Sequence, residues 1–202
     1  MTALVVGIFV FENVEVLDFA GPYEVFTTAG RVARKLDPAA AEPFRVCTVS
    51  RDGAAVRARA GLLVLPDHGF DNHPPLDVLI VPGGVVNAEL DQPDVQRWIS
   101  RVAASSRLTA SVCTGAFLLA QAGLFDGKAA TTHWEDIDDL KAMFPGLDVR
   151  SGLRWVDQGE IVSSAGISAG IDMSLHLVER LASRPLALGT ARQMEFDWTE
   201  NA

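Results

Sequence analysis

The sequence predicts an α/β protein, in which a mostly parallel sheet lies between two layers of helices, as in the flavodoxin-like three-layer αβα sandwich. Apolar runs typical of buried parallel strands alternate with helical stretches along the chain. Two of these runs, at residues 76–81 and 108–112, pass directly into glycine-containing turns. Turns of this kind are typical of the carboxyl edge of a parallel sheet, where open α/β proteins bind their ligands.

The composition is that of a folded, acidic protein. The chain has 202 residues, of which 49% are apolar and 21% charged, and this balance excludes disorder as its main state. A chain of this length suits one domain, which we expect to span residues 1–202. The formal net charge is −9 and the basic residues are scattered. No nucleic-acid partner is therefore expected, because such binding needs a basic face.

The cysteine count and the amino-terminal pattern predict a cytoplasmic protein. Cys47 and Cys113 are the two cysteines, and two suit a reducing compartment better than a disulfide framework. The first residues carry no basic segment and pass directly into a strand pattern, so no signal peptide is expected. Residues 108–125 are uncharged, but they contain polar residues and break at Cys113. This favours a strand and a helix over a membrane span.

The amino-terminal elements follow the same alternation. The apolar run at residues 4–10 predicts a strand covered on both faces, and residues 14–26 predict the first crossover helix, bent or restarted near Pro22. Residues 31–43 are polar and alanine-rich and predict a connection. Asp18 is unusual within this helix because its neighbours are apolar. An inward carboxylate and an exposed one are equally compatible with the pattern.

The remaining elements are expected to complete the sandwich. Residues 44–49 predict the second strand, with Cys47 in the core. The further expected elements are, in chain order, a hairpin or bulged strand (54–65), a loop (66–75), a strand (76–81), an amphipathic helix (93–106), a strand (108–112), a helix (115–122), a short strand (128–132), a helix (133–144), a hairpin (154–156 with 160–163) and a helix (171–182). No element is predicted for residues 190–202. His68 and His73 lie in the loop without further ligands, so no metal site is predicted.

Cys113 is the residue around which the predicted site is organised. It stands at a sharp strand-to-helix turn, where a side chain is pushed out of the sheet beside the first free N–H groups of the helix. Those groups favour a thiolate and can receive an oxyanion. The turn therefore predicts a nucleophile elbow with sulfur in place of a hydroxyl. The alternative is a structural cysteine buried in a tight turn.

Three other stretches are candidate walls of the same site. Residues 82–84 end a strand, and their glycines allow backbone N–H groups to point at a ligand, although an ordinary turn has the same sequence. His133 lies between a strand end and a helix start, a position that suits a catalytic or a structural histidine. The Gly/Ser segment at residues 165–170 precedes the last predicted helix and is the third candidate.

Three motifs together resemble the ThiJ/PfpI superfamily, which is related to the class I glutamine amidotransferases. They are Val-Pro-Gly-Gly at 81–84, Ser-Val-Cys-Thr-Gly-Ala-Phe-Leu-Leu at 111–119 and Ala-Thr-Thr-His-Trp at 130–134. The likeness covers nearly the whole chain. Within it, Leu-Asp-Phe-Ala-Gly-Pro at 17–22, together with Cys113 and Thr114, is most similar to the isonitrile hydratase branch.

This resemblance implies a set of site residues. It implies Cys113 as the nucleophile, Asp18 as the acid beside it and Thr114 as a further residue of the catalytic site. The candidate substrate- or oxyanion-binding residues are Gly83, Gly84, Gly115, His133, Gly166 and Ile167. Members of the superfamily are commonly homodimers with the site near the interface. The implied chemistry acts on a small molecule and needs no metal or organic cofactor.

The implied reaction is hydration of isonitriles to N-substituted formamides through a thioimidate intermediate, catalysed by a hydro-lyase. Two alternatives stay open: a redox or stress sensor in which Cys113 is oxidised to a sulfinic acid, and glyoxalase- or deglycase-type chemistry on small carbonyls. Protease and amidase relatives carry histidine directly after the cysteine, where this chain has Thr114, so peptidase activity is not expected. A regulator branch adds a helix-turn-helix domain, and the roughly twenty residues after Ala182 are too few for one, so DNA binding is not expected.

Overall fold

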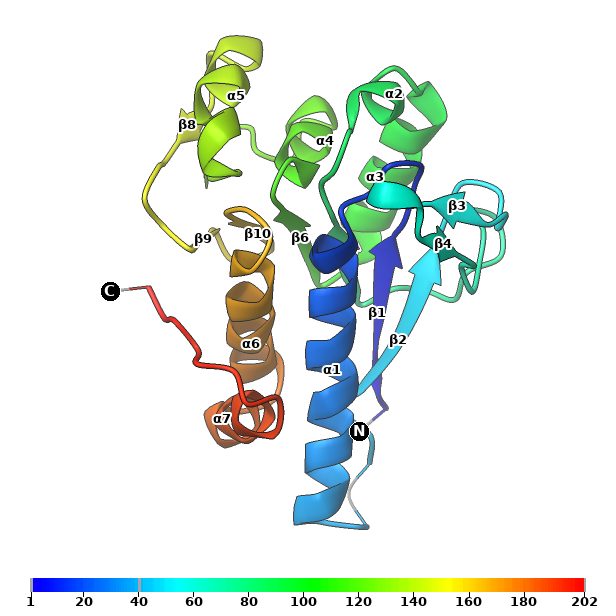
Figure 1. Cartoon of the computed structure of the whole chain (residues 1–202), viewed down its shortest axis with the longest axis vertical. Coiled ribbons are helices and arrows are strands. Elements are labelled where there is room, and N and C mark those ends of the chain that lie inside the picture. The colour runs from blue at the N-terminus through cyan, green and yellow to red at the C-terminus, as the bar shows by residue number, and fades with distance from the viewer. Residues whose placement is uncertain (1, 40, 202) are drawn as a thin grey trace.

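A six-stranded sheet forms the centre of the computed structural model, which describes residues 2–39 and 41–201 (Figure 1). The strand order is β2-β1-β5-β6-β10-β9, and every pairing is parallel except that of β9 with β10. Counting the parallel strands alone along the chain, this is the 2-1-3-4-5 order of flavodoxin-like sheets, so the predicted fold class is confirmed. The strands are β1 (Leu4–Phe9), β2 (Phe44–Val49), β5 (Val78–Val81), β6 (Leu108–Val112), β9 (Trp155–Asp157) and β10 (Ile161–Ser164).

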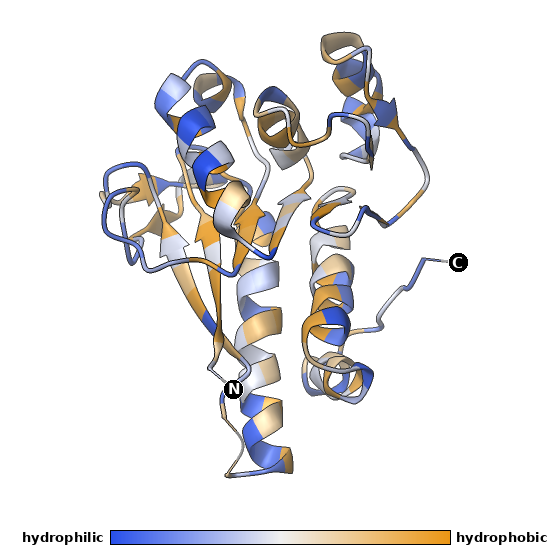
Figure 2. Cartoon of the chain, turned by 180° about the vertical axis from the view of Figure 1, so that it is seen from behind, coloured by the Kyte–Doolittle hydropathy of each residue, from blue (hydrophilic) through white to orange (hydrophobic). Residues whose placement is uncertain are grey.

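Helices cover both faces of this sheet (Figures 1 and 2). On one face, α1 (Val16–Leu36), α6 (Ala169–Leu181) and α7 (Arg184–Gln193) contact one another. On the other face lie α3 (Pro93–Ser105) and α4 (Gly115–Gln121). The apolar strand residues between these layers are buried, and Figure 2 shows the strands as the most hydrophobic part of the chain. Each fully buried aliphatic side chain contributes about 1.5–3 kcal/mol to the free energy of unfolding. The packed layers therefore hold the strand ends in place.

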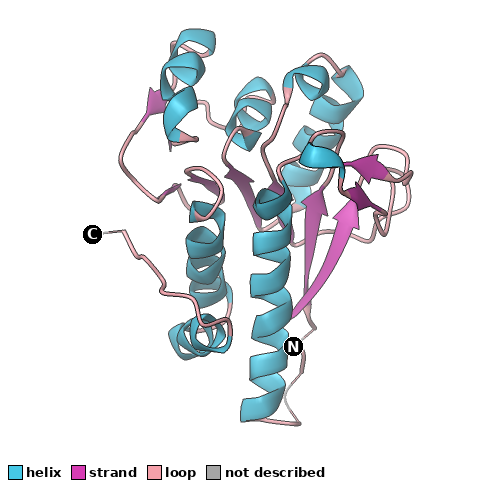
Figure 3. Cartoon of the chain, viewed as in Figure 1, coloured by secondary structure: helices cyan, strands magenta, loops and turns pink. Residues whose placement is uncertain are grey.

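Small elements gather at the carboxyl edge of the sheet, at the top of Figure 3. The short helix α2 (Asn87–Leu90) follows the turn after β5. The hairpin of β3 (Val56–Arg57) and β4 (Leu63–Val64) encloses the 3₁₀ turn η1 (Arg59–Gly61). On the far side, η2 (Trp134–Asp136) leads into α5 (Ile137–Met143), and β7 (Ala129–Ala130) pairs with β8 (Asp148–Val149). These elements form the surroundings of the strand ends.

The structure corrects three expectations about the elements. The helix α1 runs without a break through Pro22 to Leu36, so residues 31–36 are helical and not part of a connection. Residues 31–36 are mostly good helix formers, and the buried residues Phe26, Ala29 and Val32 pack into the core, so the helix continues past residue 26. The strand expected at residues 128–132 has only two residues in β7. The helix α7 was not predicted.

No helix of the described residues combines the length and the apolar character needed to cross a membrane. The uncharged stretch at residues 108–125 instead forms β6, the turn at Cys113 and α4, as predicted. Cys47 is buried in β2, also as predicted.

Candidate active site

Four segments that leave the sheet meet at its carboxyl edge. After β1 the chain passes through Asn13 and Glu15, and Glu15 N–H donates to the carbonyl of Gly83, 2.8 Å away, in the turn after β5. After β6 comes Cys113, and after β10 comes the turn that contains Ile167. The segments predicted separately as walls of one site are therefore adjacent in the fold.

Cys113 adopts a strained backbone conformation at this edge. Its φ angle is 56°, in the left-handed region that residues with a Cβ rarely occupy. Its N–H lies 3.2 Å from the carbonyl of Ser164 and 3.3 Å from that of Ala165. Its own carbonyl accepts a 2.8 Å hydrogen bond from the buried hydroxyl of Thr132. The sharp turn predicted from the sequence is present, and neighbouring strands hold it in place.

The thiol of Cys113 receives backbone N–H groups from two sides. Those of Thr114 and Ile167 act on the sulfur and lower its pKa. Ile167 reaches it with a φ of 47°, which is strained for a β-branched residue and costs about 1–3 kcal/mol. Cys113 itself is only 7% exposed. Two strained residues thus meet at one buried sulfur, an arrangement that the surrounding packing must maintain.

Asp18 lies fully buried beside this thiol. The sequence left its direction open, and the structure places it inward, on the first turn of α1. Its Oδ2 accepts a hydrogen bond of 3.0 Å from Gly83 N–H. Its Oδ1 has no partner of standard geometry, and the nearby thiol of Cys113 is the donor that acts on the carboxyl. A Cβ at position 83 would lie 2.9 Å from Oδ2 and 2.5 Å from the Thr114 hydroxyl, so Gly83 permits this approach.

Burial dominates the ionisation of both groups. It raises the pKa of Asp18 to about 7, with smaller opposing contributions from the Gly83 N–H and the thiol. Burial and, second to it, the negative charge of Asp18 together raise the pKa of Cys113 to about 12. The expectation that the helix start favours a thiolate is therefore wrong for the resting site: the two N–H groups act in that direction, but burial and the Asp18 charge outweigh them.

The hydroxyl of Thr114 connects the cysteine turn to the glycine turn. It accepts from Gly84 N–H and donates to the Gly84 carbonyl, both at 2.9 Å. Because these bonds use its donor and one acceptor site, Thr114 holds the backbone of Gly84 in place. The geometry therefore indicates a positioning residue here. Gly115 lies behind it, buried at the first position of α4.

His133 packs directly on Gly166. A Cβ at position 166 would stand 1.9 Å from His133 Cδ2, so the ring occupies the space that any side chain there would need. The Nδ1 atom accepts from Glu135 N–H at 3.3 Å and lies 3.4 Å from the Asp136 carboxylate. His133 thereby caps η2 while it supports the turn that presents Ile167.

The pocket over Cys113 also contains residues that the sequence did not single out. It has a volume of about 200 Å³. Its lining residues are Glu15, Arg59, Gly84, Cys113, Thr114, His133, Glu135, Asp136 and Ile167. The guanidinium group of Arg59 pairs with the Glu15 carboxylate at 3.2 Å, and the backbone N–H of Arg59 donates to the carbonyl of Val14, 3.0 Å away. Only the folded hairpin brings Arg59 here, so no local sequence signal identifies it.

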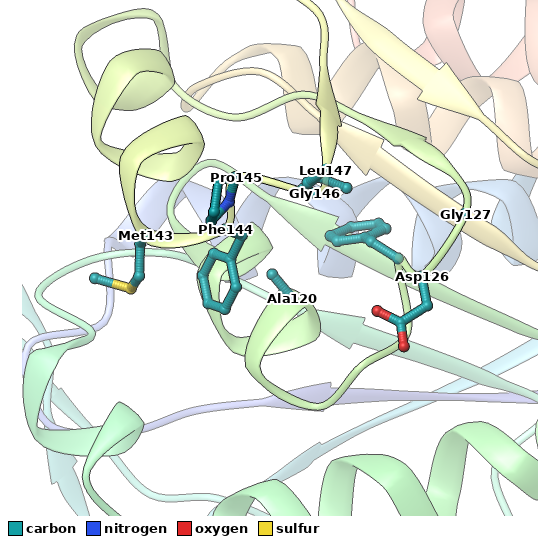
Figure 4. Close-up of a pocket in the computed structure, with 9 residues that line it drawn as sticks. Ala120, Asp126, Gly127, Met143, Phe144, Pro145, Gly146 and Leu147 are labelled. Atoms are coloured by element: carbon teal, nitrogen blue, oxygen red, sulfur yellow. The ribbon is translucent and has the colours of Figure 1, made fainter.

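A separate pocket between α4 and the end of α5 contains none of the predicted site residues (Figure 4). Met143 and Phe144 lie at one end of it and Asp126 at the other, around Ala120. It is larger, at about 340 Å³, but it has no nucleophile and no histidine in its lining. The described residues likewise contain no group of three or more His, Cys, Asp and Glu placed to hold a metal ion.

Known proteins are similar in sequence to nearly the whole of this chain. An isonitrile hydratase from Pseudomonas putida is 34% identical over 195 residues, which cover 96% of this chain and 79% of that protein. The HTH-type transcriptional regulator GbdR from Pseudomonas aeruginosa is 31% identical over 97% of this chain, which spans only 52% of the regulator.

Solved structures match the fold over the same range. The crystal structure of a ThiJ/PfpI family protein from Pseudomonas syringae has a TM-score of 0.84, with 26% identity, 99% coverage of this chain and 78% of that one. The crystal structure of Drosophila melanogaster DJ-1beta has a TM-score of 0.80 at 19% identity, and the match covers 98% of this chain and 100% of that one. The model of the DJ-1/PfpI family matches residues 5–180. This chain belongs to the DJ-1/PfpI family.

Proposed function

We propose that the chain hydrates isonitriles to N-substituted formamides, with Cys113 as nucleophile and Asp18 as proton carrier. The observation that carries the proposal is the buried pair of a thiol and a carboxyl group whose pKa of about 7 suits it to both accept and donate a proton near neutral pH. The 34% identity with an isonitrile hydratase over most of both chains supports the choice of substrate class.

The first step forms the carbon–sulfur bond. The Asp18 carboxylate accepts the thiol proton as sulfur attacks the terminal carbon of R–N≡C, and the proton then passes to that carbon. The product is the thioimidate R–N=CH–S–Cys113, in which the sulfur and the hydrogen of the thiol are both bonded to the former isonitrile carbon. The N–H groups of Thr114 and Ile167 stabilise the negative charge on sulfur as its proton leaves.

The second step releases the product and restores the thiol. Asp18 accepts a proton from water as the oxygen adds to the thioimidate carbon, and passes this proton to the nitrogen. The carbon–sulfur bond then breaks, the proton of the added hydroxyl group passes to the sulfur, and the formamide R–NH–CHO leaves. The net reaction consumes one water, and neither Cys113 nor Asp18 changes. The scheme needs no metal or organic cofactor.

The raised pKa of Cys113 favours an enzyme over a peroxide sensor. Oxidants attack the thiolate, and sensor cysteines combine a low pKa with exposure, whereas Cys113 is 7% exposed and mostly protonated at rest. Deprotonation by Asp18 during substrate attack suits a group that stays inactive until a ligand fills the site. Glyoxalase-type chemistry would use the same pair and is the second candidate to test.

The test is a substrate panel with the purified chain. Wild type and Cys113→Ser at equal concentration are given several alkyl and aryl isonitriles, and formamide is measured by chromatography; methylglyoxal serves as the competing substrate. We expect wild type to form formamide and Cys113→Ser to lose at least about 100-fold in rate, because the nucleophile is removed. Wild type that converts methylglyoxal and no isonitrile would replace the hydratase with the carbonyl-directed enzyme.

We also propose that the chain acts as a homodimer in a reducing cytoplasm. Exposed apolar side chains occur close to the site in sequence, with Leu17 38% and Trp134 75% exposed, and Ile167 at its rim is 38% exposed. Both cysteines are free, which suits a reducing compartment. Light scattering at micromolar concentration tests the assembly, and a monomer mass of 21.7 kDa would contradict it.

A further inference from the structure

A groove between α2, α4 and α5 adjoins the pocket over Cys113. We call it the α2–α5 groove; it is lined by Gly84, Val86, Asn87, Leu90, Thr114, Phe117, Asp136, Asp139, Ala142 and Met143. Its volume is about 460 Å³, more than twice that of the cysteine pocket. Gly84, Thr114 and Asp136 line both, so the two spaces lie side by side at these residues. A small group bound at Cys113 can therefore extend into the groove.

The inner wall of the groove is apolar. Val86 and Phe117 are 6% and 5% exposed and form part of the hydrophobic core. Leu90 packs against the same core, and Met143 lies at the outer end with 52% exposure. Such a wall suits an alkyl stem, which gains from contact with aliphatic and aromatic surface.

The charged residues that line the groove are acidic. Asp136 and Asp139 are the only charged residues in its lining, so no lysine or arginine lines it. His133 Nδ1 lies 3.4 Å from the Asp136 carboxylate, and among the described residues no lysine or arginine forms an ion pair with Asp136 or Asp139. The charges of Asp139 and Glu135 raise the pKa of Asp136 in addition to its burial. A bound cation would offset this repulsion.

The cysteine pocket has a different charge balance. Arg59 is the only lysine or arginine in its lining, and Glu15 neutralises it at 3.2 Å. The lining of the cysteine pocket therefore supplies no net positive charge to offset Asp136. An anionic substituent would meet Asp136 on its way in, whereas a cationic one would be attracted.

We propose that the α2–α5 groove holds the substituent of an isonitrile that carries a protonated amine on a short apolar stem. This inference rests on the proposed function and names its substrate class. The isonitrile carbon lies at Cys113, the stem runs along Phe117 and Leu90, and the amine lies beside Asp136 and Asp139. Asp139 is the specificity-determining residue, because it lines the groove without touching the catalytic pair.

Asp138 provides a matched control on the same helix. It is absent from the groove lining, its side chain is 97% exposed, and it pairs with Lys141 at 3.7 Å. Asp138→Asn and Asp139→Asn therefore change the net charge of the chain equally. They differ in whether the lost charge faces the groove.

The kinetic test compares three isonitriles of equal chain length that end in a tertiary amine, a methyl group or a carboxylate. We expect kcat/KM to be highest for the amine and lowest for the carboxylate. Asp139→Asn should lower the amine-to-methyl ratio about two- to fivefold, the effect of one partly solvated charge, and Asp138→Asn should leave it unchanged. Equal ratios in all three proteins, or a preference for the carboxylate, would overturn the inference.

A second measurement does not depend on turnover. Aminoethyl and sulfonatoethyl methanethiosulfonate each transfer their alkylthio group to a thiolate, which forms a mixed disulfide and releases methanesulfinate. Labelling rates at Cys113, separated from Cys47 by peptide mass mapping, should favour the cationic reagent, and Asp139→Asn should reduce that preference where Asp138→Asn does not. If no isonitrile is hydrated, the proposed function fails, while the labelling ratio still decides the charge preference of the groove.

Discussion

Asp18 and Cys113 face each other in a buried corner formed by the first turn of α1 and the end of β6, and neither group ionises at its usual pH. The pKa of Asp18 is raised to about 7 and that of Cys113 to about 12, chiefly because both are buried. The pair therefore holds one or two protons near neutral pH. Burial of this carboxyl group lowers the free energy of unfolding when the group is ionised, and the pH dependence of unfolding measures this loss.

The first prediction concerns stability against pH. The folded chain keeps the Asp18 proton up to about pH 7, whereas the unfolded chain releases it near 3.8. Between these values the folded state binds more protons, so the Asp18 contribution to the free energy of unfolding falls as pH rises. The loss is up to about 4 kcal/mol.

Urea unfolding at pH 5 and pH 8 measures this effect. Asp18→Asn should be more stable than wild type at pH 8, and its advantage should shrink toward pH 5. Asp138→Asn, which removes an exposed carboxylate, should keep the pH dependence of wild type. A wild-type dependence in Asp18→Asn would show that the pKa of Asp18 is not raised.

The second prediction concerns the Thr114 hydroxyl, which makes two hydrogen bonds with Gly84. Thr114→Val keeps the shape but removes both hydrogen bonds to the half-buried Gly84, at a cost of about 0.5–1.5 kcal/mol for each bond. Thr114→Ser keeps the hydroxyl and should restore most of the stability and the turnover. If valine and serine variants turn over equally well, Thr114 does not position the glycine turn through its hydroxyl.

The fold and the centre of the site follow from local patterns. Apolar runs of strand length, glycine turns and the Cys113 turn need only neighbouring residues to be recognised. They locate the central strands, the elbow and the hairpin of β9 and β10. The resemblance to the DJ-1/PfpI family adds Asp18, whose direction could not be decided from its own helix.

What could not be predicted depends on tertiary contacts. Thr27 and Gly30 are poor helix formers in the middle of α1, yet packing against the core carries the helix past them to Leu36. Arg59 reaches the site because a hairpin folds over the strand ends, and Thr132 because β7 ends beside Cys113. The raised pKa of the cysteine depends on how deeply it is buried, which no spacing reveals.

The third prediction concerns Gly166, which lies under the ring of His133. In Gly166→Ala the added methyl group would stand 1.9 Å from Cδ2, so the ring or the turn must move. We expect a loss of about 1–3 kcal/mol in the free energy of unfolding, typical of overpacking. Formamide production should fall up to about 100-fold, because the N–H of Ile167 moves with the turn.

Gly146→Ala is the control for this change. A Cβ at position 146 meets nothing within 4 Å, and the residue lies in the separate pocket of Figure 4. Its stability should stay within about 0.5 kcal/mol of wild type. Equal behaviour of the two alanine variants would mean that the contact between His133 and Gly166 does not hold the site.

The last prediction separates the two effects of Asp18 on Cys113. The negative charge of Asp18 raises the pKa of the thiol, while its carboxylate is the proposed proton carrier. Asp18→Asn removes both, so the variant should show faster alkylation and slower catalysis. The pH profile of iodoacetamide labelling at Cys113 should shift to lower pH, and formamide production should fall at least about 100-fold, as for loss of a general acid–base group. Cys47 serves as the internal control, because its pKa of about 11 is raised by burial and by Asp67, and Asp18 is not among the charges that act on it.

Turnover that survives in Asp18→Asn would leave Cys113 as the nucleophile but remove Asp18 from proton transfer. An unchanged labelling profile would show instead that the two side chains are not electrostatically coupled.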